Sequence, residues 1–461
     1  MNASRGNLLS VMSSLLCTFF LQNNVHAGNL IYVTNGGTDS AGCGAQQHAC
    51  RSISQGIENA TTGDTILVGA GRYGNISGSP TYTGPGDEHP QQISLQSATG
   101  CIVCIDKAVS LLSLHGPSVT VIEGAPLTTL EANVMILHDG VVFGAPGRGF
   151  TITGGSAYGV LVDQDSPDSQ LGIPLKNNIT IAGNVDLADS SGFAFIGRKL
   201  SDTQCPDPSC IPSAVITFAN DESVDNSASA FSMTQGLFFG GSITLQDNYA
   251  HGAAVGFDLP GGAQSPIGLS ESSMRISLVG NVAIHNGLGF YALAPGRMVA
   301  NTAAGNSQAG FEVVSGQGAF QNNTAVGNAG PGAIVQFFTD GIHNPGLLGF
   351  HSFSQNNFYG NDRHRPTLGI QIAQFPPVSY NPGPSAHCGV LNLGVLDSGF
   401  GGGPPSPPIV AALQADGNFW GTTHGPSPTG AADAVGGACD QNGGVTTAKT
   451  FVTAGFAITT H

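Results

Sequence analysis

The sequence has few charged residues. Of its 461 residues, 9% are Asp, Glu, Lys or Arg, and Lys and Arg together number 13. A protein that neutralises nucleic-acid phosphates needs a basic surface, so we expect no nucleic-acid partner. The formal net charge of −16 would also repel a polyanionic polysaccharide unless a cation bridged the two.

Beyond its N-terminus the sequence also lacks an apolar run long enough for a membrane-spanning helix, so we expect no membrane span. At the N-terminus, residues 8–21 are largely apolar, follow Arg5 and precede Val25-His26-Ala27, which has the small-residue shape of a signal-peptidase site. This pattern predicts a secretory signal peptide over residues 1–27. We therefore expect a secreted protein, extracellular or periplasmic.

Glycine is abundant by contrast, with 68 residues, and proline adds 27. Together with the scarcity of strong helix formers, this composition favours many short strands and turns over helices. The 40% content of hydrophobic residues excludes a wholly disordered chain. The composition thus predicts an all-β protein.

A repeat of the form N-x-x-x-x-N-x-x-x-G-apolar recurs every 20 to 22 residues. Its three copies begin at Asn281, Asn301 and Asn323, continue with Asn286, Asn306 and Asn328, and end at Gly289-Phe290, Gly310-Phe311 and Gly332-Ala333. A fixed period of this size indicates stacked units, each too small to bury a core alone. The sequence therefore predicts a solenoid.

Two solenoids have such a period, the leucine-rich repeat and the parallel β-helix. The repeats here are too poor in leucine for the first. Asparagine at each corner suits the second, because it tolerates the left-handed conformation of a tight turn and can pass amide hydrogen bonds between coils. The alternative is that asparagine merely marks exposed loops. The repeat resembles that of the right-handed parallel β-helix family, the architecture of pectate lyases and their relatives.

Both ends of the chain support this resemblance. Residues 51–60, with Ile53 and Ile57 four apart, fit a short amphipathic helix that precedes Asp64-Thr-Ile-Leu-Val68. This order resembles the opening of bacterial β-helix proteins, in which a capping helix covers the open end of the solenoid. Near the C-terminus, Asn418-Phe-Trp-Gly421 is similar to the closing passage of the same proteins. Trp420 there is expected to plug the core, with sugar stacking as the alternative.

We therefore expect one domain over residues 28–461, since solenoids grow without the usual limit on domain size. Its most regular coils should span about 242–365. Two segments rich in proline, about 200–212 and about 375–408, read as irregular excursions from the coils.

After removal of the signal peptide, eight cysteines remain. An even number in a secreted chain suggests disulfides, and the sequential pairing is Cys43 with Cys50, Cys101 with Cys104, Cys205 with Cys210, and Cys388 with Cys439. A zinc site at Cys101-Ile-Val-Cys104 is the competing interpretation, but no second pair of this kind accompanies it.

The resemblance implies a secreted protein that acts on, or binds, extracellular polysaccharide along one outer face. Lyases of this family use calcium held by carboxylates, with Arg or Lys abstracting a proton. Two groups of carboxylates could supply calcium ligands: Asp163, Asp165 and Asp168, and then Asp221, Glu222 and Asp225. The competing interpretation is that each group is a solvated turn.

Hydrolases of the same fold carry N-T-D, D-D, G-H-G and R-I-K motifs in that order. The chain has His251-Gly252 and Arg275-Ile-Ser277, but neither the first two motifs nor the lysine. Since hydrolysis needs two carboxyl groups at a set separation, this likeness is weak. The run Asp362-Arg363-His364-Arg365 could clamp a carboxylate and exchange protons, or simply form a charged turn.

Two functions of different class remain open. The first is a polysaccharide-active protein, which as an enzyme would be a lyase or a glycoside hydrolase. The second is a non-catalytic surface, structural or adhesion module. In either case we expect ligand contact on the regular coils between about 242 and 365, because successive coils of a solenoid build its long binding face.

Overall fold

The structure is a computed structural model. It describes residues 28–74, 83–89, 100–124, 131–154, 157–163, 177–196, 213–234, 240–259, 275–293, 296–314, 318–339, 350, 352–363, 370–372, 378–380, 386–397, 411–427, 432–441 and 444–458. Side chains at the edges of some of these segments are not described. The predicted signal peptide lies outside the described residues.

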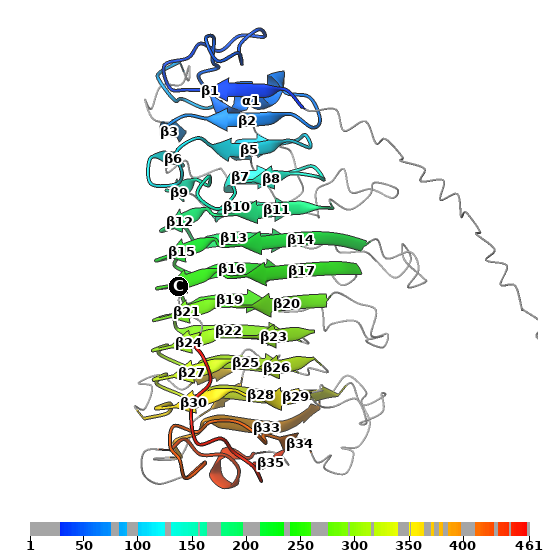
Figure 1. Ribbon diagram of the computed structural model, residues 1–461, viewed down its shortest axis with the longest axis vertical. Helices are drawn as coiled ribbons and strands as arrows, with labels where there is room; N and C mark the ends of the chain where they lie inside the picture. Colours follow the sequence, from blue (N-terminus) through cyan, green and yellow to red (C-terminus); the bar gives the residue numbers. More distant parts are fainter. Residues whose placement is uncertain are drawn as a thin grey trace, which may run out of the picture.

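The chain folds as a right-handed parallel β-helix, in which successive coils stack along one axis (Figure 1). Each regular coil contributes a strand to each of three parallel sheets, in the order first, second, third. Neighbouring strands within a sheet come from successive coils, as the repeat predicted.

The first sheet contains β1 (Leu30–Val33), β2 (Thr65–Val68), β5 (Ser110–Ser113), β8 (Val142–Phe143), β11 (Ile179–Ala182), β14 (Ser213–Ala219), β17 (Gly240–Gln246), β20 (Arg275–Val279), β23 (Arg297–Val299), β26 (Ala319–Gln321) and β29 (Ser352–Ser354). The second contains β3 (Gly71–Gly74), β6 (Thr120–Glu123), β9 (Thr151–Thr153), β12 (Val185–Leu187), β15 (Glu222–Val224), β18 (Tyr249–His251), β21 (Val282–Ile284), β24 (Thr302–Ala304), β27 (Thr324–Val326) and β30 (Asn357–Tyr359). The third contains β4 (Cys101–Ile105), β7 (Ala132–Ile136), β10 (Tyr158–Asp163), β13 (Ser191–Ile196), β16 (Ser229–Thr234), β19 (Val255–Leu259), β22 (Leu288–Leu293), β25 (Phe311–Val314), β28 (Ala333–Thr339) and β33 (Val390–Asp397).

Two small sheets and a short 3₁₀ helix lie toward the C-terminus. Strands β31 (Ile370–Ile372) and β32 (Val378–Tyr380) pair antiparallel; β32 lies within the segment of about 375–408 that was expected to leave the coils, and β31 lies just before it. Strands β34 (Ala411–Gln414) and β35 (Gly444–Thr447) pair parallel, and η4 (Gly437–Cys439) precedes β35.

The predicted N-terminal helix is confirmed as α1 (Ile53–Asn59). The helix begins there because the Ser52 hydroxyl accepts a hydrogen bond from the Gln55 amide at 3.1 Å. Ile53 and Ile57 are buried, and the helix packs against β1, β2 and β4. Since α1 lies between β1 and β2, it takes the place that later coils give to strands of the second and third sheets. It therefore caps the solenoid.

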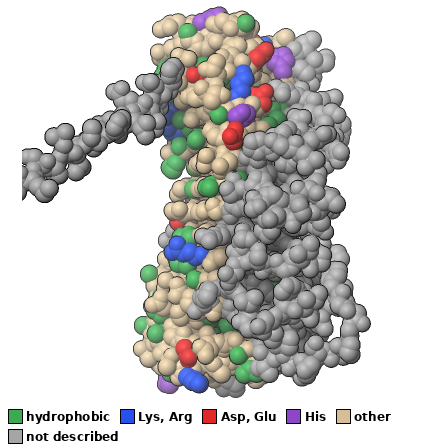
Figure 2. All heavy atoms as spheres, turned by 90° about the vertical axis from the view of Figure 1, so that its right-hand side faces the viewer, with side chains coloured by type: hydrophobic (Ala, Val, Ile, Leu, Met, Phe, Trp, Pro, Cys, Tyr) green, Lys and Arg blue, Asp and Glu red, His purple; other side chains and the backbone are tan. Residues whose placement is uncertain are grey.

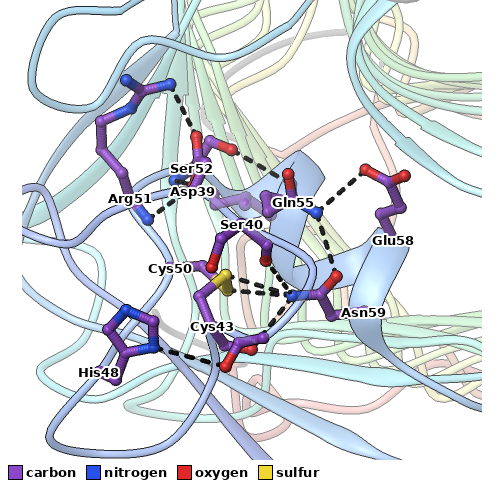
Figure 3. Close-up of a disulfide and its surroundings, with 12 residues drawn as sticks. Asp39, Ser40, Cys43, His48, Cys50, Arg51, Ser52, Gln55, Glu58 and Asn59 are labelled. Atoms are coloured by element: carbon purple, nitrogen blue, oxygen red, sulfur yellow. Dashed lines mark hydrogen bonds and ion pairs between the residues drawn. A yellow bond between two sulfur atoms is a disulfide. The ribbon is translucent and has the colours of Figure 1, made fainter.

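Figure 3 shows how the loop before α1 is fastened to the helix beside the Cys43–Cys50 disulfide. Asp39 accepts a hydrogen bond from Arg51 Nη2 at 2.7 Å and another from the Ser52 amide at 3.0 Å. At the other end of the helix, Asn59 Nδ2 donates to the carbonyl of Cys43 at 3.1 Å. The cap is thus held by a covalent bond and by hydrogen bonds at both helix ends.

Two columns of side chains, mostly asparagine amides with two aspartates, run along the corners of the solenoid. The first-corner ladder, between the first and second sheets, consists of Asn184, Asp221, Asn248, Asn281, Asn301, Asn323, Asn356 and Asn418. The second-corner ladder, between the second and third sheets, includes Asn286, Asn306, Asn328, Asn361 and Asp433. All of these residues are buried. The predicted stacking of the repeat asparagines is confirmed.

The reason for asparagine at these corners differs in part from the expectation. The left-handed conformation belongs to the residue before each ladder asparagine, such as Gly280 (φ 70°) before Asn281 and Ala300 (φ 58°) before Asn301. The ladder asparagine instead supplies hydrogen bonds: Asn301 Oδ1 accepts from both the backbone N and the Nδ2 of Asn281 at 3.0 Å. Buried polar groups at the corner are thereby satisfied.

The core inside the coils contains a column of stacked phenylalanines. Rings of Phe231, Phe257, Phe290 and Phe311 lie 4.7 to 4.8 Å from their neighbours and nearly parallel. Because strands of successive coils are about 4.8 Å apart, residues in register place their rings at stacking distance. The column ends near Trp420, which is fully buried and stacks on Phe358 at 5.2 Å. Trp420 therefore closes the core and is not available to stack on sugar.

Three predicted disulfides are confirmed, namely Cys43–Cys50, Cys101–Cys104 and Cys388–Cys439. The zinc alternative at Cys101 and Cys104 is therefore wrong. Cys205 and Cys210 lie outside the described residues. Within the described segments, no helix is long and apolar enough to cross a membrane.

Candidate functional site

The candidate site lies on the outer face of the second sheet, on three successive coils. Strands here alternate strictly, so the middle residues Ser223, Ala250 and Ala283 are buried inside the solenoid. The flanking residues therefore point outward. Register places Glu222 above Tyr249 and Val224 above His251.

Two acids, a tyrosine and two histidines gather on this face and at its edge. The ring centroids of Tyr249 and His251 are 6.4 Å apart and those of His251 and His285 are 5.6 Å apart. Nδ1 of His251 lies 3.6 Å from Oδ1 of Asp225. Together with Glu222, these residues form what we call the Tyr249 cluster. Half-buried and exposed side chains make up the cluster, so a ligand can reach it.

Two glycines make room for the cluster. A Cβ atom at Gly252 would lie 2.3 Å from Oδ1 of Asp225, and one at Gly305 would lie 2.8 Å from Cδ2 of His285. Both glycines also have positive φ, 76° and 62°. Because each glycine lies under the side chain of the coil before it, Asp225 and His285 can fold down against the corner.

The cluster is polar and acidic in character. Burial raises the pKa of Tyr249, and the nearby charge of Glu222 raises it further, so this phenol stays a neutral donor. The carboxylates of Glu222 and Asp225 accept hydrogen bonds, while imidazole rings both donate and accept. A planar ring beside such groups suits a polyhydroxylated ligand, which presents apolar C–H faces and many hydroxyls.

In the column that contains Tyr249, exposure ends just below this residue. Val282, the next residue in that column, has 2% exposure, and Thr302 and Thr324 below it are also buried. The C-terminal segment runs back along the solenoid on this side (Figure 1), and the Phe456 amide donates to Asn357 Oδ1 at 2.8 Å. The Tyr249 cluster therefore lies at the boundary between the exposed and the buried parts of this column.

The structure does not bring Asp221, Glu222 and Asp225 together as calcium ligands. Asp221 points inward into the first-corner ladder, Glu222 points outward, and Asp225 lies in the turn beside His251. More generally, the described part of the chain places no three His, Cys, Asp or Glu side chains so that they could hold a metal ion. Asp163 ends β10 and is buried, and Asp165 and Asp168 lie outside the described residues.

The predicted run from Asp362 to Arg365 is described only in its first half. Asp362 Oδ2 accepts from the Cys388 amide at 3.0 Å, and burial raises the pKa of this carboxyl. Arg363 Nη2 lies 3.3 Å from Oδ1 of the fully buried Asp433. Both residues therefore fasten the last coils together.

His364 and Arg365 lie outside the described residues. Arg275 begins β20 in the first sheet, and its side chain is likewise not described. Of the six residues proposed for catalysis, His251 is thus the one that the structure places in an accessible polar cluster among the residues it describes.

A second polar column lies on the outer face of the third sheet. Asp258, Tyr291 and Glu312 are in register on three coils, with Ser229 Oγ donating to Asp258 and Gln336 Nε2 donating to Glu312. Burial, then the charges of Glu312 and Asp258, raise the pKa of Tyr291. Glu312 is fully buried and Tyr291 has 8% exposure, so this column is less suited to contact a ligand.

The coils expected to contact a ligand, about 242–365, contain Tyr249 and His285, but the sequence does not show that these residues are neighbours. The signal was present in the corner ladder, since Asp221, Asn248 and Asn281 occupy one column. Counting from these residues aligns Glu222 with Tyr249. This alignment is hidden in the sequence for two reasons. Asp221 takes the place of a ladder asparagine, and the intervals of 27 and 33 residues between the ladder positions differ from the regular period of 20 to 22 residues.

Charge is unevenly distributed over the described surface. Figure 2 shows that, on the side it views, charged and histidine side chains gather mainly near the N-terminal coils, while the middle carries few.

In comparisons with known proteins, the chain matches no family model, no curated protein and no solved structure. The site must therefore be interpreted from its own chemistry.

Proposed function

We propose that the protein is a secreted polysaccharide-binding β-helix and that the Tyr249 cluster contacts the glycan. The carrying observation is the outward grouping of Tyr249 with Glu222, Asp225, His251 and His285 on three successive coils. At about 4.8 Å per coil, the cluster extends over roughly 10 Å along the axis. A chain-like ligand lying along the solenoid would meet its members in succession.

The resemblance of the asparagine repeat to that of the β-helix family that includes pectate lyases supports a carbohydrate ligand. Fold alone does not determine function, however, so the chemistry of the cluster carries more weight. Polysaccharides combine apolar ring faces with hydroxyls, and Tyr249 with its carboxylate and imidazole neighbours offers partners for both.

Charge selects among polysaccharides. With a net charge of −16 and Glu222 and Asp225 in the cluster, the surface disfavours polyuronates. We therefore expect uncharged or amino-sugar polysaccharides to bind directly, and pectin or alginate to bind only when a divalent cation neutralises part of the charge.

The test is a binding screen of the purified protein on uncharged glycans, pectins, alginates and glycosaminoglycans, with and without calcium. Tyr249→Ala should weaken binding of the best ligand by about tenfold or more, and His251→Ala should weaken it as well. Tyr359→Ala is the matched control, because Tyr359 points outward from the same sheet on β30, near the C-terminal end.

Failure of every glycan to bind, or equal losses for Tyr249→Ala and Tyr359→Ala, would overturn the proposal. The same samples distinguish a binding protein from an enzyme, through release of new reducing ends or of unsaturated products. The incomplete hydrolase motifs and the scattered carboxylates Asp221, Glu222 and Asp225 favour a non-catalytic module, so we expect binding without turnover.

A further inference from the structure

The first-corner ladder follows one hydrogen-bonding rule. From Asn281 to Asn356, Oδ1 of each asparagine accepts from the backbone N and the side chain of the ladder residue before it, while Nδ2 donates to a carbonyl and to Oδ1 of the ladder residue after it. Asn248 shows the donating half, with Nδ2 bonded to Phe218 O and to Asn281 Oδ1, both at 3.0 Å. A ladder side chain thus needs one atom that accepts hydrogen bonds from the coil before it and one that donates a hydrogen bond to the coil after it.

Asp221 breaks this rule chemically but keeps its geometry. Oδ1 of Asp221 accepts from the backbone N and the Nδ2 of Asn184 at 2.9 and 3.1 Å, as an asparagine would. Oδ2 stands where the other members carry their NH₂ group. This oxygen is fully buried and has no hydrogen-bond donor, and the groups that NH₂ meets at the equivalent positions are oxygen acceptors.

We propose that Asp221 is a neutral carboxylic acid in the folded protein, with a proton on Oδ2 that replaces an amide hydrogen of the ladder. An ionised carboxylate would place a negative oxygen among acceptors, without a donor, in the interior. A protonated carboxyl has the shape of an amide and the donor that the position requires. The proton therefore completes the ladder.

The charges around Asp221 agree with this assignment. Asn184 and Asn248 contact it from the coils before and after, and both are uncharged amides. Of the neighbouring acids, Glu222 points outward and Asp186 bonds to Asn226 Nδ2 at 2.8 Å. Among the residues that the structure describes, no Lys, Arg or His forms an ion pair with Asp221. Burial raises its pKa to about 8, against the lowering effects of the Asn184 bonds and of the backbone N–H of Ala219.

The acid in the second-corner ladder provides a contrast. Asp433 accepts from Asn361 Nδ2 at 2.7 Å and also lies beside Arg363. That arginine supplies a counter-charge, and the pKa of Asp433 is raised less, to about 6. Of the two ladder acids Asp221 and Asp433, the one without an adjacent counter-charge is therefore Asp221.

The consequence is a pH-sensitive coil directly behind Glu222 of the Tyr249 cluster. The folded pKa of Asp221 lies above its ordinary value of 3.8, so the folded state binds the proton more tightly than the unfolded state. Its contribution to stability is therefore complete in acid and is lost as the pH rises through about 8. Alkaline pH should loosen the solenoid at this coil first.

Thermal unfolding of wild type and Asp221→Asn from pH 5 to pH 10 tests the inference. The asparagine supplies a permanent donor, so the melting temperature of the variant should exceed that of wild type at pH 9 by about 3 °C or more, with a smaller difference at pH 6. Asp247→Asn is the matched control, since Asp247 is an exposed corner acid one residue before Asn248; its pH profile should parallel wild type.

Infrared difference spectra between pH 6 and pH 10, recorded on wild type and on Asp221→Asn, provide a second readout. Wild type should show a C=O band of a protonated interior carboxyl that is lost at alkaline pH and that the variant lacks, while the buried acids Glu88 and Asp186 contribute to the spectra of both proteins. Parallel melting curves for wild type and Asp221→Asn, or a wild-type spectrum without that band at pH 6, would overturn the inference. Neither result depends on glycan binding.

Discussion

Arg363 is one residue whose expected role changes with the structure. The sequence placed it in a run that could clamp a ligand carboxylate, whereas its guanidinium lies 3.3 Å from Asp433, a fully buried member of the second-corner ladder. An arginine in this position compensates a buried charge, and its loss leaves that charge unpaired.

We therefore predict that Arg363→Ala lowers the free energy of unfolding by about 2 kcal/mol, measured by urea denaturation at pH 7. Adding Asp433→Asn should recover most of this loss, because an amide oxygen still accepts the bonds from Asn361 without carrying charge. A single variant as stable as wild type, or a double variant no better than the single one, would contradict the structural role.

Residue identities explain why the ladders were partly predictable. The regular spacing of Asn281, Asn301 and Asn323 predicts that they stack in one column. Asp433 does not, since 72 residues separate it from its partner Asn361 and an irregular segment intervenes. The hydrogen bonding of the two Asp221 oxygens depends on Asn184 and Asn248, which lie on the coils before and after it. These contacts cannot be read from the sequence.

Among the elements, the last coils differ from the rest in how they are secured. The Cys388–Cys439 disulfide closes a separation of 51 residues, against 7 for Cys43–Cys50. In the chain-entropy account, the longer loop gives the larger stabilisation, roughly 4 against roughly 2 kcal/mol. It joins the start of β33 to η4 and so holds the C-terminal end of the solenoid.

Replacing Cys388 and Cys439 by serine should accordingly open this end while sparing the centre. Coils of a solenoid contact mainly their neighbours, so the effect should decay along the stack. Hydrogen exchange followed by mass spectrometry should show faster exchange in β33 and unchanged exchange in β10. Uniform acceleration through all three sheets would contradict this local behaviour.

The elements themselves were predictable to different degrees. The helix expected over 51–60 is α1 (Ile53–Asn59), because its capping serine and buried isoleucines are local signals. Short apolar runs such as Val160 to Val162 became strands of the third sheet. Which residues point outward required the register, and hence the Tyr249 cluster was not assembled from sequence.

At the scale of the whole molecule, the structure is a long stack with a polar but little-charged surface. Such a shape offers an extended ligand several coils at once. The C-terminal segment occupies part of the second sheet, with Asn357 bonded to Phe456. In the column that contains Tyr249, the exposed groups therefore lie on the coils before β21. Contact with a glycan should be local, although the solenoid is long.

Hydroxyl-radical footprinting, with and without the polysaccharide that binds best in the screen, tests the glycan site most directly. We predict protection of Tyr249, His251 and His285, with no change at Trp420, which is buried in either state. Protection confined to other coils, or binding without any protection at these three side chains, would contradict the assignment of the site to the Tyr249 cluster.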